Sequence, residues 1–352
     1  SIYPTHVCSH RARNILVLNI VFIQKLRLNH PRWQCKKKIT LEIPMALDQT
    51  TEAFLKGLAE QEGPAFHELP PEKCRELFTG LCVSLQGDVV SMDSVTNQTI
   101  DGPNGDIPIR IYHPKKTQEK LPLIVLFHGG GWVIGDLESH DNMCRYLAKA
   151  SEAILVAVDY RLAPENKFPS GVDDCIAATD WVCKHGADLG GDTGRVVVTG
   201  DSAGGNMAAV VAQQLKGKIA LQVLIYPVTD LTGTDYASRG KFGGGEYLLS
   251  MADMEYFGGH YSNNPEELAG PKASPITQAD LSGLAPALTI TAGYDPLVDE
   301  GKAYADKLKE AGVKSEYKCF EGTIHGFTLF PAALTSAQEG LDLIADYIKR
   351  EL

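Results

Sequence analysis

Short apolar segments alternate with stretches of helical periodicity from residue 95 to the end of the chain, and this alternation limits the possible folds more than any other feature. The apolar segments, rich in β-branched residues, predict strands at 107–112, 123–127, 154–158, 195–199, 221–226, 287–292 and 315–320. Helical patterns lie between them, near 140–150, 172–184, 206–215 and 300–311, and a last one follows Ala332. Continuous apolar strands are buried on both faces, so the alternation predicts an α/β fold with a mostly parallel central sheet flanked by helices.

One long stretch interrupts the alternation. Residues 231–274 lie between two expected core strands, are rich in Tyr, Phe and Met, and show no clear strand pattern. Their glycine triplet is not followed by the Lys-Ser/Thr of a phosphate-binding loop, so we interpret it as a loop. Two helical patterns, at 51–61 and 71–85, precede the first strand. We expect 45–95 and 231–274 to form a helical cap over a core made of 96–230 and 275–352.

The first 44 residues differ in composition from the rest of the 352-residue chain. They hold eight Lys/Arg and one acid, a local charge of +7, which leaves −18 for the remainder of a chain with net charge −11. Their apolar run at 15–23 is too short to span a membrane and no small-residue cleavage site follows it. We interpret 1–44 as a leader, non-native or disordered, with a basic anchor as the alternative. The acidic remainder disfavours nucleic acid and anionic membranes as partners.

Eight cysteines are scattered along the chain, without a C-x-x-C pair or a His/Cys cluster at the spacing of zinc ligands. This usage is typical of reduced thiols in a cytosolic protein. We therefore expect a cytoplasmic location and no metal site.

The pentapeptide Gly200-Asp201-Ser202-Ala203-Gly204 stands where an expected strand meets an expected helix. A sharp strand-to-helix turn strains the central serine, and side chains two residues to either side would collide, which accounts for the glycines. Ala203 opens the helix, so its N–H is an unpaired donor at the positive end of the helix. We predict that Ser202 is a nucleophile and that Ala203 donates to an oxyanion.

A nucleophilic serine needs a general base and a group that orients the base. His325 follows the last expected strand, so the order Ser, acid, His that is known for such sheets is preserved. Asp295 follows the preceding strand closely and is the expected acid. Asp230 and Asp299 are competitors, which we expect to support the start of the insertion and to charge the first turn of the next helix, respectively.

The segment His128-Gly129-Gly130-Gly131-Trp132 follows the expected strand at 123–127. Consecutive glycines let backbone N–H groups point at one place with no side chains in the way. We expect Gly129 and Gly130 to complete the oxyanion hole with Ala203, and His128 to hold the loop without moving protons.

Five motifs in a fixed order together resemble the hormone-sensitive-lipase family of α/β-hydrolases, from about residue 50 to the C-terminus. They are His128-Gly129-Gly130-Gly131-Trp132, Asp159-Tyr160-Arg161-Leu162-Ala163-Pro164-Glu165, Gly200-Asp201-Ser202-Ala203-Gly204-Gly205, Asp295-Pro296-Leu297-Val298-Asp299-Glu300 and His325-Gly326-Phe327. The Asp before the serine is similar to the GDSAG branch. The resemblance implies a carboxylesterase of the α/β-hydrolase fold with a helical cap, the triad Ser202, Asp295 and His325, and oxyanion donors Gly129, Gly130 and Ala203. It also implies short to medium acyl esters as substrates and a homodimer. Nothing in the family matches residues 1–44.

The predicted function is therefore hydrolysis of small esters through an acyl-enzyme, with no metal or organic cofactor. Candidate substrate-binding residues are Trp132, Phe242, Tyr247 and Met251, with Phe54, Phe66 and Tyr256 as further candidates. Each of the aromatic and Met side chains in the cap suits core packing equally well. We expect Arg161, Glu165 and Asp201 to hold loops behind the site. Two rival functions stay open at this stage: an amidase or peptidase on the same fold, and a non-catalytic small-molecule receptor.

Overall fold

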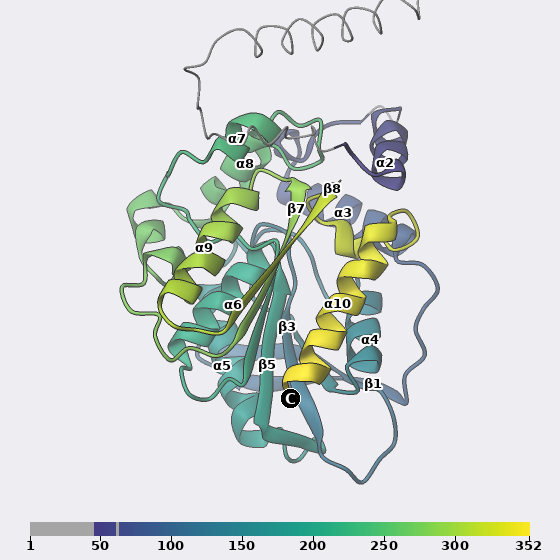
Figure 1. Cartoon of the computed structure of the whole chain (residues 1–352), viewed down its shortest axis with the longest axis vertical. Coiled ribbons are helices and arrows are strands. Elements are labelled where there is room, and N and C mark those ends of the chain that lie inside the picture. The colour runs from purple at the N-terminus through teal and green to yellow at the C-terminus, as the bar shows by residue number, and fades with distance from the viewer. Residues whose placement is uncertain (1–45, 61–62) are drawn as a thin grey trace, which may run out of the picture. The chain divides into compact units, whose positions relative to one another are not determined.

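The predicted strands form one eight-stranded sheet in the computed structural model, which describes residues 46–60 and 63–352 (Figure 1). The strands are β1 (Ser94–Gly102), β2 (Gly105–His113), β3 (Leu121–Phe127), β4 (Ile154–Val158), β5 (Gly191–Asp201), β6 (Leu221–Ile225), β7 (Ala287–Tyr294) and β8 (Ser315–Ile324). Their order is β1-β2-β4-β3-β5-β6-β7-β8, and only the β1–β2 and β2–β4 pairs are antiparallel. The prediction of a mostly parallel α/β sheet is confirmed. The leader predicted at 1–44 lies outside the described residues.

Helices cover both faces of the sheet (Figure 1). One face carries α4 (Asp141–Ala150) and α10 (Thr335–Glu351), and the other carries α5 (Ser170–His185), α6 (Ala203–Gln214) and α9 (Val298–Glu310). Alternate side chains of β3 show how the layers are joined. Leu123, Val125 and Phe127 pack in the same cluster as α5 and α6, whereas Ile124 and Leu126 pack with α4 and α10. All five are completely buried, which is why this strand is a continuous apolar run.

The strand β1 has no counterpart among the predicted strands. Its sequence, SVTNQTIDG, contains one buried side chain, Ile100, which lies opposite Ile107 of β2. Because β1 is an antiparallel strand at the edge of the sheet, most of its side chains are exposed and no apolar alternation marks it.

Two segments far apart in sequence, the described part of 46–85 (46–60 and 63–85) and 231–274, lie beyond the carboxyl ends of the parallel strands (Figure 1). Their elements are α2 (Gln49–Ala59), η1 (Phe66–Glu68), α3 (Pro71–Leu85), α7 (Ala237–Phe242), α8 (Met251–Tyr261) and η2 (Pro265–Ala269). Two short helices of the core, η3 (Pro275–Thr277) and η4 (Phe327–Leu329), complete the list. The segments are bonded to each other: His67 Nδ1 lies 2.8 Å from Asp253 Oδ1, and the Tyr256 hydroxyl donates to the Leu69 carbonyl at 2.8 Å.

Helix α2 is attached differently from η1 and α3. The Asp48 N–H donates to the Gly322 carbonyl on β8 at 2.8 Å, and the Phe54 ring packs against Phe330 with centroids 5.3 Å apart. The helix therefore contacts the core through β8, whereas η1 contacts α8.

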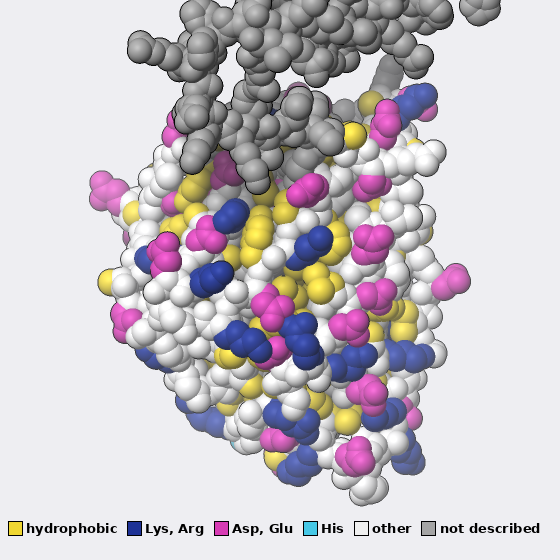
Figure 2. Space-filling model, in the orientation of Figure 1, with side chains coloured by type: hydrophobic (Ala, Val, Ile, Leu, Met, Phe, Trp, Pro, Cys, Tyr) yellow, Lys and Arg dark blue, Asp and Glu magenta, His cyan; other side chains and the backbone are white. Residues whose placement is uncertain are grey.

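Both signs of charge are spread over the face shown in Figure 2, where Lys and Arg concentrate on the lower half. Carboxylates are interspersed among these basic side chains, so the described part of this face is not uniformly basic. No helix within 46–60 and 63–352 is both long and apolar enough to cross a bilayer. The six cysteines among these residues, Cys74, Cys82, Cys144, Cys175, Cys183 and Cys319, are all free thiols.

Candidate active site

Ser202 occupies the turn between β5 and α6 in a strained conformation, with φ 55° and ψ −117°. The turn is sharp because neighbouring backbone approaches it closely. A Cβ added at Gly204 would lie 1.9 Å from the Phe127 carbonyl oxygen, and one at Gly200 would lie 2.4 Å from the same atom. Only glycine fits at these two positions, so the pattern around the serine follows from contact between β5, α6 and the end of β3.

The three residues predicted as nucleophile, base and acid are joined by hydrogen bonds. His325 Nε2 lies 2.9 Å from Ser202 Oγ, and His325 Nδ1 lies 2.7 Å from Asp295 Oδ2. Asp295 is completely buried in the loop after β7, where its other oxygen accepts the Leu297 N–H at 2.8 Å. His325 follows β8, and the ring of Tyr226 at the end of β6 packs against it with centroids 4.8 Å apart. Four neighbouring strand ends thus supply this cluster.

The competing acids bond elsewhere. Asp230 accepts hydrogen bonds from the Thr232 N–H at 2.8 Å and the Tyr236 hydroxyl at 2.9 Å. Asp299 accepts the Ser238 N–H at 2.8 Å, at the start of α7. Both carboxylates hold the entry of the 231–274 segment.

The Gly129 N–H is not available to an oxyanion. It donates to Asp201 Oδ1 at 2.9 Å, and His140 Nε2 lies 3.0 Å from the same oxygen. The prediction that Gly129 is an oxyanion donor is therefore wrong, because the carboxylate next to Ser202 occupies its N–H. Gly130 and Gly131 line the pocket beside Ser202. The run of three glycines in the sequence does not indicate which of their N–H groups point toward Ser202.

Asp201 and His140 form a buried pair beneath the glycine loop. Burial by itself would raise the pKa of Asp201, but His140 beside it and the Gly129 N–H lower that pKa on balance. Sequence reasoning missed His140, which lies 61 residues from Asp201. Its position at the start of an amphipathic helix gave no signal of catalysis or loop support.

His128 packs behind the same loop, as a structural residue would. Its ring stacks on Tyr160 with centroids 4.3 Å apart, its Nδ1 lies 2.8 Å from the Gly129 carbonyl oxygen, and the Tyr160 hydroxyl donates to the His128 carbonyl. Burial lowers the pKa of His128 to about 4. The ring is therefore neutral near pH 7.

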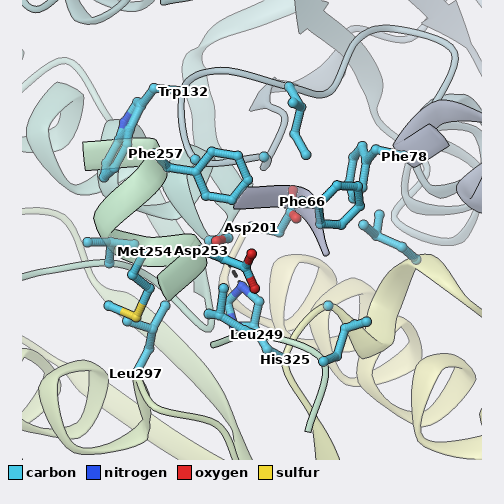
Figure 3. A pocket seen from close by; sticks show the side chains of 18 of the residues that line it. Phe66, Phe78, Trp132, Asp201, Leu249, Asp253, Met254, Phe257, Leu297 and His325 are labelled. Carbon is cyan, nitrogen blue, oxygen red and sulfur yellow. Dashed lines mark hydrogen bonds between the residues drawn. The ribbon is translucent and has the colours of Figure 1, made fainter. Parts of the chain in front are cut away.

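Ser202 and His325 open into an apolar cavity of about 120 Å³ (Figure 3). The described residues that line it, besides these two, are Phe66, Phe78, Leu81, Gly130, Gly131, Trp132, Ile134, Asp201, Val228, Leu231, Leu248, Leu249, Asp253, Met254, Phe257, Leu297, Gly326, Leu329 and Phe330. Figure 3 shows Phe66 and Phe78 on one side and Trp132, Met254 and Phe257 on the other, with Asp253 and His325 between them. Aromatic walls on two sides suit a compact apolar substrate.

Helix α8 covers the glycine loop. A Cβ added at Gly131 would lie 2.5 Å from the Phe257 ring, and Trp132 stacks on Tyr261 with centroids 4.2 Å apart. Trp132 has φ 62°, unusual for a residue with a bulky side chain, and this contact holds it there.

Of the four substrate-binding residues predicted in the sequence, only Trp132 lines the cavity. Phe242 and Tyr247 pack against Tyr294, with ring centroids 5.4 and 5.0 Å away, and Met251 packs against Gly243. The predictions for Phe242, Tyr247 and Met251 are therefore wrong: the first two lie before α8 and pack on Tyr294, and the orientation of α8 turns Met251 away from the cavity. That helix presents its 253, 254 and 257 positions to the cavity, a helical period that could have been read from the sequence had the helix boundaries been known.

Among the further candidates, Phe66 lines the cavity, whereas Phe54 packs on Phe330 and the Tyr256 hydroxyl bonds to Leu69.

The charged residues of the 159–165 motif hold loops. Arg161 donates from Nε and one terminal nitrogen to the two oxygens of Asp174, at 2.8 and 2.7 Å. Glu165 accepts from both terminal nitrogens of Arg75, which also donates to the Val133 and Ala163 carbonyls. The Arg75 guanidinium lowers the pKa of Glu165 to about 2. Arg75 thus fastens α3 to the loop that carries Trp132.

No cluster of three or more His, Cys, Asp or Glu side chains suited to a metal ion occurs in the described ranges.

The family profile described as alpha/beta hydrolase fold matches residues 124–329, and the chain belongs to this family. Its similarity to named esterases places it with the esterases of the hormone-sensitive-lipase type, as the sequence motifs predicted.

Individual relatives agree with this assignment. The chain is 41% identical to the carboxylic ester hydrolase LipN of Mycobacterium tuberculosis over 282 residues, which are 77% of this chain and 74% of that protein. It is 34% identical to ethyl acetate hydrolase of Pseudomonas putida, covering 88% of this chain and 100% of the relative. Among solved structures, a hyperthermophilic esterase from the archaeon Pyrobaculum calidifontis is 42% identical and superposes with a TM-score of 0.82, covering 87% of this chain and 99% of that one.

Proposed function

We propose that this protein hydrolyses short to medium acyl esters through an acyl-enzyme formed on Ser202. The observation that carries the proposal is the continuous hydrogen-bonded chain from Ser202 Oγ through His325 to the buried Asp295. This geometry activates a serine without any other group.

In the proposed mechanism His325 Nε2 takes the Ser202 proton as Oγ attacks the ester carbonyl carbon. Asp295 orients the imidazole and stabilises its charged form. His325 then returns the proton to the departing alcohol as the carbon–oxygen bond of the ester breaks. Water, deprotonated by the same histidine, attacks the acyl-enzyme and releases the carboxylic acid and the free serine.

We assign the oxyanion donors as the N–H groups of Gly130, Gly131 and Ala203. Gly130 and Gly131 line the cavity beside Ser202, and Ala203 is the first residue of α6. The first N–H groups of a helix have no partner within it, and the helix dipole favours negative charge there. Asp201 contributes indirectly, by fixing the Gly129 N–H and hence the start of the loop.

We propose that η1, α3 and the 231–274 segment together are the cap. Support comes from the bonds between η1 and α8, from Phe257 against Gly131, and from the apolar lining that these elements give to the cavity. The Pseudomonas relative is named for its action on ethyl acetate, a small ester, which agrees with the modest volume of this cavity.

The test is hydrolysis of p-nitrophenyl esters from acetate to palmitate, compared with a p-nitroanilide, by the full chain and by Ser202→Ala. We expect the highest kcat/KM for short to medium esters and a loss of at least about 10³-fold in Ser202→Ala. Absence of Ser202-dependent turnover of every ester would contradict the proposal and favour a receptor. Faster turnover of the anilide would identify an amidase.

We further propose a homodimer formed through β8. This strand ends the sheet order and pairs with β7 within the described residues, so its other edge, apart from the Gly322 carbonyl that accepts the Asp48 N–H, is the place for a second copy to pair. Sedimentation velocity at micromolar concentration should give the mass of a dimer, and a monomer throughout that range would exclude it.

A further inference from the structure

The candidate substrate cavity contains a fixed negative charge that the proposed reaction does not use. Two carboxylates line it, Asp201 and Asp253, and no Lys or Arg occurs among the described lining residues. Asp201 is bonded to His140 and the Gly129 N–H, beneath the glycine loop. Asp253 comes from α8, on the covering side of the cavity.

The Asp253 carboxylate is held firmly in place. Oδ2 accepts hydrogen bonds from the Ser250 hydroxyl at 2.5 Å and the Ser250 N–H at 3.3 Å, which closes a capping box at the start of α8. Oδ1 lies 2.8 Å from His67 Nδ1 and accepts the His67 N–H at 3.3 Å. Its side chain is only 8% exposed. These partners fix the position of the charge relative to the cavity.

The surroundings of Asp253 make its charge effective. Leu249, Met254 and Phe66 line the same cavity as the Asp253 carboxylate, and Figure 3 shows Asp253 between Met254 and Phe66. Apolar walls exclude water, and a charge is screened less in such surroundings than at the surface. The side chain of His67, which is 35% exposed, contacts the carboxylate from the outer side.

We infer that Asp253 makes this cavity select esters that are neutral or carry a positive charge, and reject esters whose acyl part carries a carboxylate. The inference rests on the proposed function and names the substrate class of the same site. An anionic acyl group would enter an apolar cavity that already holds a carboxylate, and the described residues around it include no lysine or arginine to pair with that group. A neutral acyl group is not repelled by the carboxylate, and an acyl group that carries an ammonium is attracted to it.

The same charge acts on the product. Hydrolysis turns a neutral ester and water into an alcohol, a carboxylate and a proton, so a negative charge appears in the cavity at the end of each cycle. Repulsion from Asp253 favours departure of the carboxylate. Weak inhibition by the acid product is therefore expected together with rejection of anionic substrates.

The experiment compares three p-nitrophenyl esters with acyl chains of similar length: valerate, which is neutral, hydrogen glutarate, which is anionic, and trimethylammonio-butyrate, which is cationic. The measured quantity is the kcat/KM of each charged ester relative to valerate, and the inhibition constant of free valerate. The variant is Asp253→Asn, which keeps an oxygen acceptor for Ser250. The matched control is Glu255→Gln, which removes the same charge from an exposed position of the same helix.

We expect the wild type to turn over the glutarate ester at least about tenfold less well than valerate, as the repulsion between two charges in an apolar cavity implies. Asp253→Asn should raise the glutarate-to-valerate ratio about tenfold, lower the ratio for the cationic ester, and strengthen inhibition by valerate. Glu255→Gln should leave all three readouts as in the wild type.

Equal turnover of the three esters by the wild type would overturn the inference, as would equal shifts in Asp253→Asn and Glu255→Gln. A purely structural role of Asp253 would lower all rates in proportion and leave the ratios unchanged. If Asp253→Asn does not fold, Asp253→Ser, with a smaller hydrogen-bonding side chain, provides the same ratios. Ser202-dependent turnover of valerate shows separately whether the proposed function holds.

Discussion

At the scale of single residues, the site depends on close approach between backbone segments. Gly200 and Gly204 lie against the end of β3, and Gly131 lies against the Phe257 ring. The strained conformation of Ser202 persists because these contacts and the hydrogen bond from its N–H to the Ile225 carbonyl leave no other arrangement. The position of the Ser202 hydroxyl therefore depends on neighbouring glycines, which leave room for the strained turn.

Substitution Gly204→Ala tests this dependence. A methyl group at Gly204 would lie 1.9 Å from the Phe127 carbonyl oxygen, so the turn must shift and carry Ser202 away from His325. We expect a loss of at least about 100-fold in kcat/KM for the best ester, as small misplacements of reacting groups cause, together with destabilisation of about 1–3 kcal/mol.

The matched control is Gly57→Ala in α2, where an added Cβ meets nothing within 4 Å. This variant should keep wild-type kinetics and unfold at an equal or slightly higher temperature, since alanine favours helix. Full activity in Gly204→Ala would show that the turn tolerates a side chain, contrary to the geometry.

At the scale of elements, α8 and α3 build the cavity from two segments that are far apart in the sequence. Helix α8 supplies cavity lining through Asp253, Met254 and Phe257 and packs Tyr261 on Trp132. Helix α3 is fastened by Arg75, which bonds to Glu165 and to two carbonyls of neighbouring loops. Both helices therefore line the cavity, α3 through Phe78 and Leu81, and α3 also fixes the loop that carries Trp132.

At the scale of the whole molecule, buried ionisable groups near the site couple folding to pH. Burial first, and His140 second, lower the pKa of His128 from 6.5 to about 4. In the unfolded chain this histidine takes up a proton near pH 6.5, whereas in the folded protein it stays neutral down to about pH 4. Between these values the unfolded state binds more protons, so the free energy of unfolding falls as the pH falls.

We therefore predict that the wild type loses up to about 3 kcal/mol between about pH 6.5 and 4 through this group alone. Chemical denaturation at several pH values should show a shallower acid-side slope for His128→Gln than for the wild type. The control is His185→Gln, at a side chain that is 49% exposed, which should retain the wild-type slope. Identical slopes for His128→Gln and the wild type would show that His128 does not cause the loss of stability at acid pH.

Much of the fold was predictable because the buried parallel strands are short apolar runs. The segments at 154–158 and 123–127 needed no tertiary information, since burial on both faces leaves a continuous apolar pattern. The edge strand β1 was not predictable in this way, because its exposed residues carry no period. Ser202, Asp295 and His325 could be nominated from their places after successive strands, since the carboxyl ends of parallel strands meet at one edge.

The sequence by itself determined the α/β class, the family, and the three residues nominated for catalysis, because strand burial and chain order are properties of local pattern. Only the tertiary structure decided that the Gly129 N–H is bonded to Asp201 and which side chains line the cavity. Gly129 and Gly131 belong to the same run of glycines. Asp201 accepts the N–H of Gly129, whereas Gly131 lines the cavity. Likewise the rotation of α8 placed Asp253 and Phe257 in the cavity and left Met251 outside it. These outcomes depend on contacts between segments distant in the chain, which no local pattern records.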